Sequence, residues 1–137
     1  MKYLCLIYDD EKVLEAMPKP EQDAFMGEYF AFTEAVQAAG QYVAGEALHP
    51  VATATTVRIR NGRLVTTDGP FAETREQLGG FYLIEARDLN EALQVAARIP
   101  SARTGSIEVR PVVVFGPPTE AEALPGHHTT GAPTAAT

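Results

Sequence analysis

The chain has 137 residues, a length typical of one domain. Apolar residues make up 45% and charged residues 21%, as in soluble globular proteins, which excludes general disorder, a fibrous repeat and a membrane protein. Eleven Lys and Arg residues against eighteen Asp and Glu residues give a formal net charge of −7. Because duplex-binding modules carry a basic stripe, we do not expect nucleic acid as a partner.

The cellular compartment follows from the cysteine count and from the apolar runs. One cysteine, Cys5, cannot form an internal disulfide, which favours a reducing compartment. The apolar run at residues 3–8 is too short for a signal-peptide core, and no other stretch approaches the ~18 apolar residues of a spanning helix. We therefore expect a cytoplasmic protein with no membrane partner, and we interpret Cys5 as a buried, inert thiol.

The first half of the folded region predicts a strand, a helix and a second strand. Residues 2–8 are rich in aromatic and aliphatic side chains and end in an acidic turn, as strands do. Residues 18–39 indicate a helix that Gly40 ends, and residues 41–48 predict a strand stopped by a His-Pro pair. The apolar stripe of the helix is Phe25, Met26, Tyr29, Phe32, Thr33 and Val36.

The second half predicts a hairpin, a strand, a helix and a last strand. Residues 55–60 and 63–67 are joined by Asn-Gly, a strong two-residue hairpin signal. Residues 79–86 predict a strand, Asp88 caps a helix, and residues 107–115 predict the last strand. The buried stripe expected for that helix is Leu89, Ala92, Leu93 and Ala96.

This order of elements is the split βαβ arrangement called ferredoxin-like, an α+β fold with an antiparallel sheet and, here, an inserted hairpin. Both helices then cover one face of the sheet and leave the other face open. Residues 3–8 are apolar on both sides of their alternation, so the open face also needs a cover. We predict a homodimer in which two open sheet faces pack together.

The composition changes sharply after residue 116. Residues 117–137 are mostly Pro, Thr, Ala and Gly, which bury too little apolar surface to offset their ordering entropy. We expect a folded domain over residues 1–116 and a disordered tail over 117–137. The tail contains His127 and His128, which make a poor metal site by themselves.

Residues 67–80 join the hairpin to the next strand and are rich in ionisable side chains. Their Asp-Gly-Pro run predicts a turn in which Asp68 can accept backbone N–H bonds. The spacing of residues 74–77 fits a capping box, which predicts a short helical turn. We expect this segment to bring Asp68, Glu73 and Glu76 close together.

Residues 68–81, DGPFAETREQLGGF, resemble the signature of the DGPF-domain branch of the YCII-related family. Supporting stretches are residues 45–50, 54–58 and 107–111, so the resemblance covers residues 1–114. It implies a dimeric α+β barrel built from ferredoxin-like units, whose members are often encoded beside alternative sigma factors. It implies no firm function.

The resemblance also implies an active site that this chain does not match. A His–Asp pair, with the histidine in or near the first helix, is proposed for some members of the family. This chain has no histidine before His49, so that pair is not carried over.

Three residues are candidates for acid–base catalysis. Asp68 is either a general base or a turn former. Glu46, at the end of an apolar strand, either moves a proton or pairs with Arg58 or Arg110. His49 is either an acid–base residue near neutral pH or part of a loop.

The remaining candidates would bind a substrate. Arg58 and Arg110 lie within strands, where an arginine can hold a carboxylate or phosphate or form an ion pair. Tyr82 either hydrogen-bonds a ligand or packs. Glu73 and Glu76 either surround a cation or amine, or stabilise the start of a helical turn.

Two functions from different classes fit these observations. One is acid–base chemistry on, or binding of, a small polar metabolite in a pocket near residues 68–80. The other is a non-catalytic dimeric module that assists transcription regulation through a protein partner. Alternatively, the signature only locks its loop, with Phe71 at the dimer seam.

No phosphate loop, metal-spaced Cys/His set or Gly-x-Ser-x-Gly elbow is present, so no cofactor or metal is expected.

Overall fold

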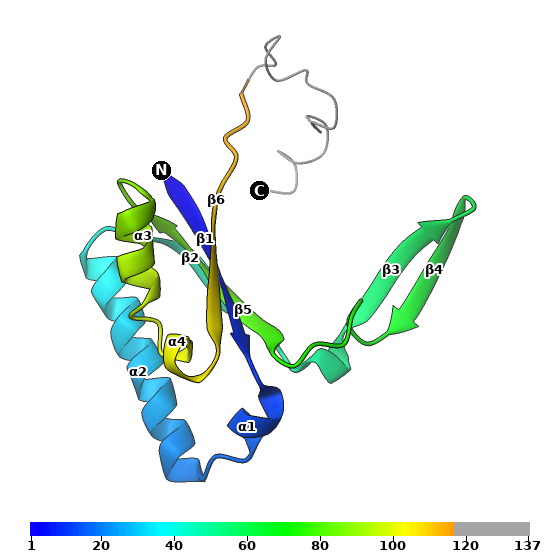
Figure 1. Ribbon diagram of the computed structural model, residues 1–137, viewed down its shortest axis with the longest axis horizontal. Helices are drawn as coiled ribbons and strands as arrows, with labels where there is room; N and C mark the ends of the chain where they lie inside the picture. Colours follow the sequence, from blue (N-terminus) through cyan, green and yellow to red (C-terminus); the bar gives the residue numbers. More distant parts are fainter. Residues whose placement is uncertain (117–137) are drawn as a thin grey trace.

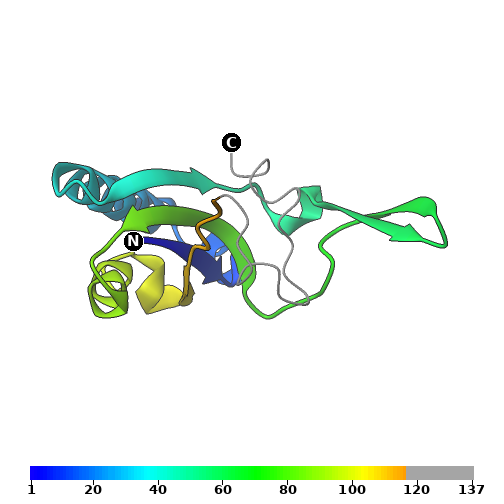
Figure 2. The same cartoon turned by 90° about the horizontal axis from the view of Figure 1, so that it is seen from above.

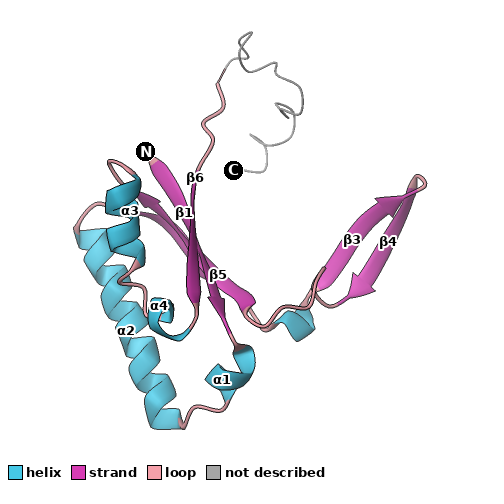
Figure 3. Ribbon diagram, viewed as in Figure 1, coloured by secondary structure: helices cyan, strands magenta, loops and turns pink. Residues whose placement is uncertain are grey.

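The computed structural model describes residues 1–116 and shows a four-stranded antiparallel sheet with helices against one face, together with a separate two-stranded hairpin (Figures 1 and 3). The tail expected over residues 117–137, with its paired histidines, lies outside the described residues. The strands are β1 (Lys2–Asp9), β2 (Tyr42–Ala47), β3 (Thr55–Arg60), β4 (Arg63–Asp68), β5 (Gln77–Glu85) and β6 (Ser106–Pro111). The helices are α1 (Glu11–Glu15), α2 (Lys19–Ala38), η1 (Val51–Thr53, a 3-10 turn), α3 (Leu89–Ala96) and α4 (Ser101–Thr104).

The main sheet has the strand order β2-β5-β1-β6, and every neighbouring pair is antiparallel. This is the ferredoxin-like arrangement predicted from the sequence, with β3 and β4 inserted between β2 and β5. The sheets formed by residues 1–116 are open, so a single chain closes no barrel.

The core lies between this sheet and the helices α2 and α3. Alternate residues of β1 are buried and the intervening ones are half-buried, as the alternation of a strand requires. From the helices, Phe32 and Val36 of α2 and Ala92 of α3 pack against that buried face. The open face of β1 carries Leu4 and Leu6, which no helix of the core covers.

The helices α2 and α3 begin where the sequence predicts, whereas α1, η1 and α4 were not predicted, and the buried side of α3 differs from the expected one. Asp88 accepts a hydrogen bond from the backbone N–H of Glu91 at 2.9 Å and so caps α3. Leu89 and Leu93, expected to be buried, are 49% and 48% exposed. Val95 takes their place, because the side of α3 that meets the sheet is rotated toward Ala92, Val95 and Ala96.

Two other local expectations are wrong. Residues 74–77 form no helical turn, because Gln77 begins β5 and its side-chain amide donates to the carbonyl of Thr74 at 2.6 Å. The last strand ends at Pro111 and does not reach residue 115. Its neighbour β1 begins at Lys2, so no strand within residues 1–116 lies beside residues 113–115. The last hydrogen bond between the two strands runs from the Val112 N–H to the Lys2 carbonyl.

Strands β3 and β4 form a hairpin that projects away from the rest of the molecule, and we call residues 55–68 the arm (Figures 1 and 2). Its turn is Asn61-Gly62, with φ of 52° and 73°, as two-residue hairpin turns with positive φ require. Neither strand pairs with the main sheet. No helix within residues 1–116 is long and apolar enough to cross a membrane.

Candidate ligand-binding cavity

A cavity of about 550 Å³ lies between α1, α2 and the strands β1, β2 and β5. Its walls are mainly apolar because the inner side of α2 and the buried face of the sheet both line it. Aromatic rings form much of the wall: Phe25 and Tyr29 meet edge to face with centroids 5.4 Å apart, and Tyr29 stacks on Tyr82 at 6.5 Å. The apolar lining residues are Ile7, Leu14, Met17, Phe25, Met26, Tyr29, Tyr42, Phe81 and Tyr82.

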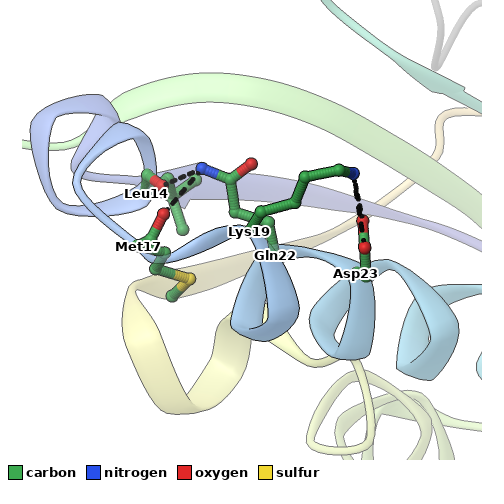
Figure 4. A network of polar contacts seen from close by, with 5 residues as sticks. All are labelled: Leu14, Met17, Lys19, Gln22 and Asp23. Carbon is green, nitrogen blue, oxygen red and sulfur yellow. Dashed lines mark hydrogen bonds and ion pairs between the residues drawn. The ribbon is translucent and has the colours of Figure 1, made fainter.

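One side of the cavity is closed by α1 and the turn that follows it. The Gln22 side chain donates to the carbonyls of Met17 at 2.9 Å and Leu14 at 3.4 Å, which ties this turn to the start of α2 (Figure 4). At the other end, the Glu11 N–H donates to the Gln77 side chain at 2.9 Å. The Glu11 carboxylate accepts from the Val51 N–H at 3.0 Å, so α1 is tied to both β5 and η1.

Asp9 is the buried carboxylate of the cavity. It is the last residue of β1 and is only 6% exposed. Its Oδ1 accepts a hydrogen bond from the Thr104 hydroxyl at 2.7 Å. Within residues 1–116 no group donates a hydrogen bond to Oδ2. Every fully buried side-chain oxygen in this part of the chain has a hydrogen-bond partner, so Oδ2 is not fully buried. We infer that Oδ2 is accessible from the cavity that Asp9 lines.

The corner between α4 and β6 holds this carboxylate in place. A Cβ atom on Gly105 would lie 2.6 Å from Asp9 Oδ1 and 2.0 Å from the carbonyl oxygen of Tyr8. Only glycine allows the corner to approach the end of β1 so closely. Thr104 can therefore reach Asp9 across 95 positions of sequence.

Two bonded pairs of hydroxyl groups line the cavity together with Asp9. The Tyr29 and Ser101 hydroxyls are 2.5 Å apart. Thr33 donates to the Tyr29 carbonyl at 2.9 Å, so its 2.7 Å bond with Tyr82 uses the Tyr82 proton. Burial, with a smaller contribution from the negative charge of Asp9, raises the pKa of Tyr29 to about 12, and burial also raises the pKa of Tyr82. Both phenols are therefore protonated at neutral pH.

Of the eight site residues that the sequence suggested, Glu46 and Tyr82 line this cavity. Tyr82 is 8% exposed and serves mainly in packing, with its hydroxyl bonded to Thr33. Glu46 is exposed and stands opposite Phe81, which stands opposite Leu6, so its side chain is on the open face of the sheet and not on the buried face that lines the cavity.

The other acid–base candidates lie elsewhere. Asp68 is exposed at the base of the arm, and its carboxylate accepts no hydrogen bond from residues 1–116. The turn is closed instead by the Gly69 N–H, which donates to the carbonyl of Ala54 at 2.8 Å. His49 is exposed in the loop between β2 and η1. These residues and the cavity carboxylate are not brought together around one ligand.

The substrate-binding candidates are also dispersed. Arg58 lies on the arm, and Arg110 lies 3.9 Å from Glu108 in an exposed ion pair. Glu76 accepts a hydrogen bond from the Ser106 hydroxyl at 2.8 Å, while Glu73 is exposed. In the described part of the chain, no three His, Cys, Asp or Glu side chains are grouped to hold a metal ion.

Sequence reasoning missed Asp9, although a signal for it was present. Tyr3, Cys5 and Ile7 share the buried face of β1, and the alternation continues to Asp9. The Asp-Asp-Glu run that begins there predicts a turn, and this stronger signal hides the continuation of the alternation. Thr104, which bonds Asp9, and Ser101, which bonds Tyr29, had no comparable signal, because they come from the far end of the domain.

Comparison with known proteins identifies the family. Residues 1–116 match the YCII-related domain. An uncharacterised protein of Rhizobium meliloti (strain 1021) is 41% identical over 119 residues, which cover 85% of this chain and 96% of that protein. The chain therefore belongs to the YCII-related family.

A solved structure is also similar. It is 5-chloro-2-hydroxyhydroquinone dehydrochlorinase from Burkholderia phenoliruptrix AC1100, in complex with 2,5-dihydroxybenzoquinone. The sequence identity is 15%, the alignment covers 82% of this chain and 94% of that one, and the TM-score is 0.49.

Proposed function

We propose that this chain binds a small organic molecule with a compact apolar body in the cavity, and that Asp9 acts on the polar group of that molecule. The observation that carries the proposal is a carboxylate only 6% exposed at the wall of a cavity lined by aromatic rings, with Oδ1 bonded to Thr104 and no hydrogen bond to Oδ2 from residues 1–116. Pockets of this size with few polar groups are typical of small-molecule sites.

The chemistry that suits this site is proton transfer. A ligand hydroxyl, amine or acidic C–H placed against Asp9 Oδ2 would donate to it, and the carboxylate would serve as the general base. The Thr104 bond keeps the acceptor oriented. Because one of the Tyr29 and Ser101 hydroxyls donates to the other, the pair keeps one proton that it can donate to an oxygen of the ligand.

This proposal moves the site away from Asp68 while keeping it near the signature segment. Gln77, Gly79 and Gly80, which end that segment, line the cavity. Because the walls are mainly apolar, the ligand should be amphipathic and not simply polar. We also assign the chain to the DGPF-domain branch and, from its single Cys5, to the cytoplasm.

A second proposal concerns assembly. We propose that two copies pack through their open sheet faces, supported by the half-buried Leu4, Leu6 and Leu83 that no helix of the core covers. A non-catalytic role in transcription regulation through a protein partner would use such a dimer as its scaffold.

Ligand binding is tested by screening phenols, aromatic amines and cyclic alcohols against the wild type, Asp9→Asn and Asp68→Asn by thermal shift and calorimetry. We expect a compound that binds the wild type and Asp68→Asn equally and binds Asp9→Asn at least tenfold more weakly, about 1.4 kcal/mol, because the accepting charge is lost. A bound compound whose affinity depends on Asp68 and not on Asp9 would refute the assignment. Turnover that Asp9→Asn abolishes would distinguish catalysis from binding alone.

A further inference from the structure

One side of the arm is apolar and has no cover in the single chain. Val57, Ile59 and Leu64 are 59%, 60% and 66% exposed. Ile59 stands directly opposite Leu64, and Val57 is two residues before Ile59, so the three share one face of the hairpin. An isolated two-stranded hairpin is at best marginally stable in water. We therefore expect another protein surface to cover this apolar face.

The other side of the arm is cationic. Arg60 stands opposite Arg63 and Arg58 stands opposite Val65, so the three arginines share the second face. Within residues 1–116 none of these arginines forms an ion pair. The whole chain has a formal net charge of −7. A cationic arm on an acidic chain is complementary to a second copy of that chain.

The open sheet face offers a surface that matches the arm in both respects. Glu46, Phe81, Leu6 and Glu108 stand opposite one another in a row across β2, β5, β1 and β6. The row has apolar residues at its centre and a carboxylate on each edge strand. The apolar side of the arm suits the apolar part of this face, and the arginines on its other side reach carboxylates at the edge strands only around the tip of the hairpin.

The arm cannot cover the sheet of its own chain in this arrangement. It points away from the main sheet (Figures 1 and 2). Its base is closed by the Gly69 N–H, which donates to the Ala54 carbonyl, and by the Thr56 hydroxyl, which donates to the Gly69 carbonyl, both at 2.8 Å. A projecting, closed hairpin is suited to reach another molecule.

We propose that the arm of each copy clasps a second copy of this chain. Its apolar side packs against the margin of the partner's open sheet face. Arg60 and Arg63 flank the turn, from which their long side chains reach carboxylates at the sheet edges. This inference rests on the sheet-face dimer proposed above and adds a separate contact to it.

The test compares Leu64→Ser with Val65→Ser, neighbours on one strand that point to opposite sides of the arm. Sedimentation over a range of concentrations gives the dimer dissociation constant. We expect Leu64→Ser to raise it at least tenfold, because a dimer buries two copies of this side chain, and Val65→Ser to change it less than threefold. Arg60→Glu should also weaken the dimer, most strongly at low salt.

The outcomes separate the two proposals. A wild-type dimer that Leu64→Ser leaves unchanged would overturn the clasp and leave the sheet-face dimer standing. A wild type that is monomeric at all concentrations would overturn both. A monomer that binds duplex DNA, with binding lost in Arg60→Glu, would show that the arm serves a nucleic acid. Both serine variants should melt as the wild type when monomeric, since neither side chain is in the core.

Discussion

At the scale of single residues, the site depends on how one carboxylate is held. Asp9 is buried beside aromatic rings, and a buried carboxylate needs a donor or an open path to solvent. Thr104 supplies the donor to one oxygen, and the cavity supplies the space beside the other. Gly105 permits this contact only because it has no Cβ.

Gly105→Ala should therefore destabilise the protein by about 1–3 kcal/mol, because the added Cβ would overlap the Tyr8 carbonyl and force the backbone apart. Urea unfolding measures this. Gly27→Ala is the matched control: it lies within α2 with nothing within 4 Å of the added Cβ, and it should stabilise by about 0.5–1 kcal/mol. Equal effects of the two substitutions would show that the corner is not tightly packed.

At the scale of elements, the local signals in the sequence predicted most of the secondary structure. The apolar period of α2 and the Asn-Gly turn of the arm both depend on neighbouring residues, and both are confirmed. The capping-box spacing at residues 74–77 failed because strand pairing of Gln77 with Asp9 overrode it. No apolar periodicity in the sequence predicts helix α1. Its position depends on the hydrogen bonds that the Gln22 side chain donates to the Leu14 and Met17 carbonyls.

Gln22→Ala should loosen α1, because the variant loses the two bonds that tie the turn after α1 to α2. Hydrogen exchange over residues 10–18 should become faster, and ligand affinity should fall about three- to tenfold as this wall of the cavity becomes less ordered. The control is Asp23→Ala, which breaks only the exposed Lys19–Asp23 pair next to it (Figure 4). Unchanged exchange in Gln22→Ala would mean that α1 is held from its other end.

At the scale of the whole molecule, one helix-covered core carries the stability of the fold. It contains a thiol and phenols among its apolar side chains: Cys5, Tyr29 and Tyr82 all contact it. Burial raises the pKa of Cys5 from its ordinary value of 9.0 to about 11, and the pKa of Tyr29 from 10.0 to about 12. The folded state therefore holds these protons more tightly than the unfolded chain.

Stability should be constant between pH 7 and about 8.5 and should then fall. The unfolded chain loses its thiol proton near pH 9 and its phenol protons near pH 10, while the folded state keeps them until about pH 11 and 12. The stabilisation is full below these unfolded pKa values and is lost as the pH rises through the folded ones. Urea unfolding at pH 8 and 10.5 measures the difference, and Cys5→Ala should remove the part that begins near pH 9. If the wild type had the same free energy of unfolding at pH 10.5 as at pH 8, the predicted loss of stability would be wrong.

The sequence by itself determined most of the elements, the ferredoxin-like order, the family and the two-sided apolar sheet. Each of these follows from residues that are near one another along the chain or from a contiguous motif. Only the tertiary structure decided where the candidate site lies. It brings Thr104 to Asp9 across 95 positions and Ser101 to Tyr29 across 72, while it places Asp68 on the arm. Such contacts depend on how the helices pack on the sheet, and no local period or spacing encodes them.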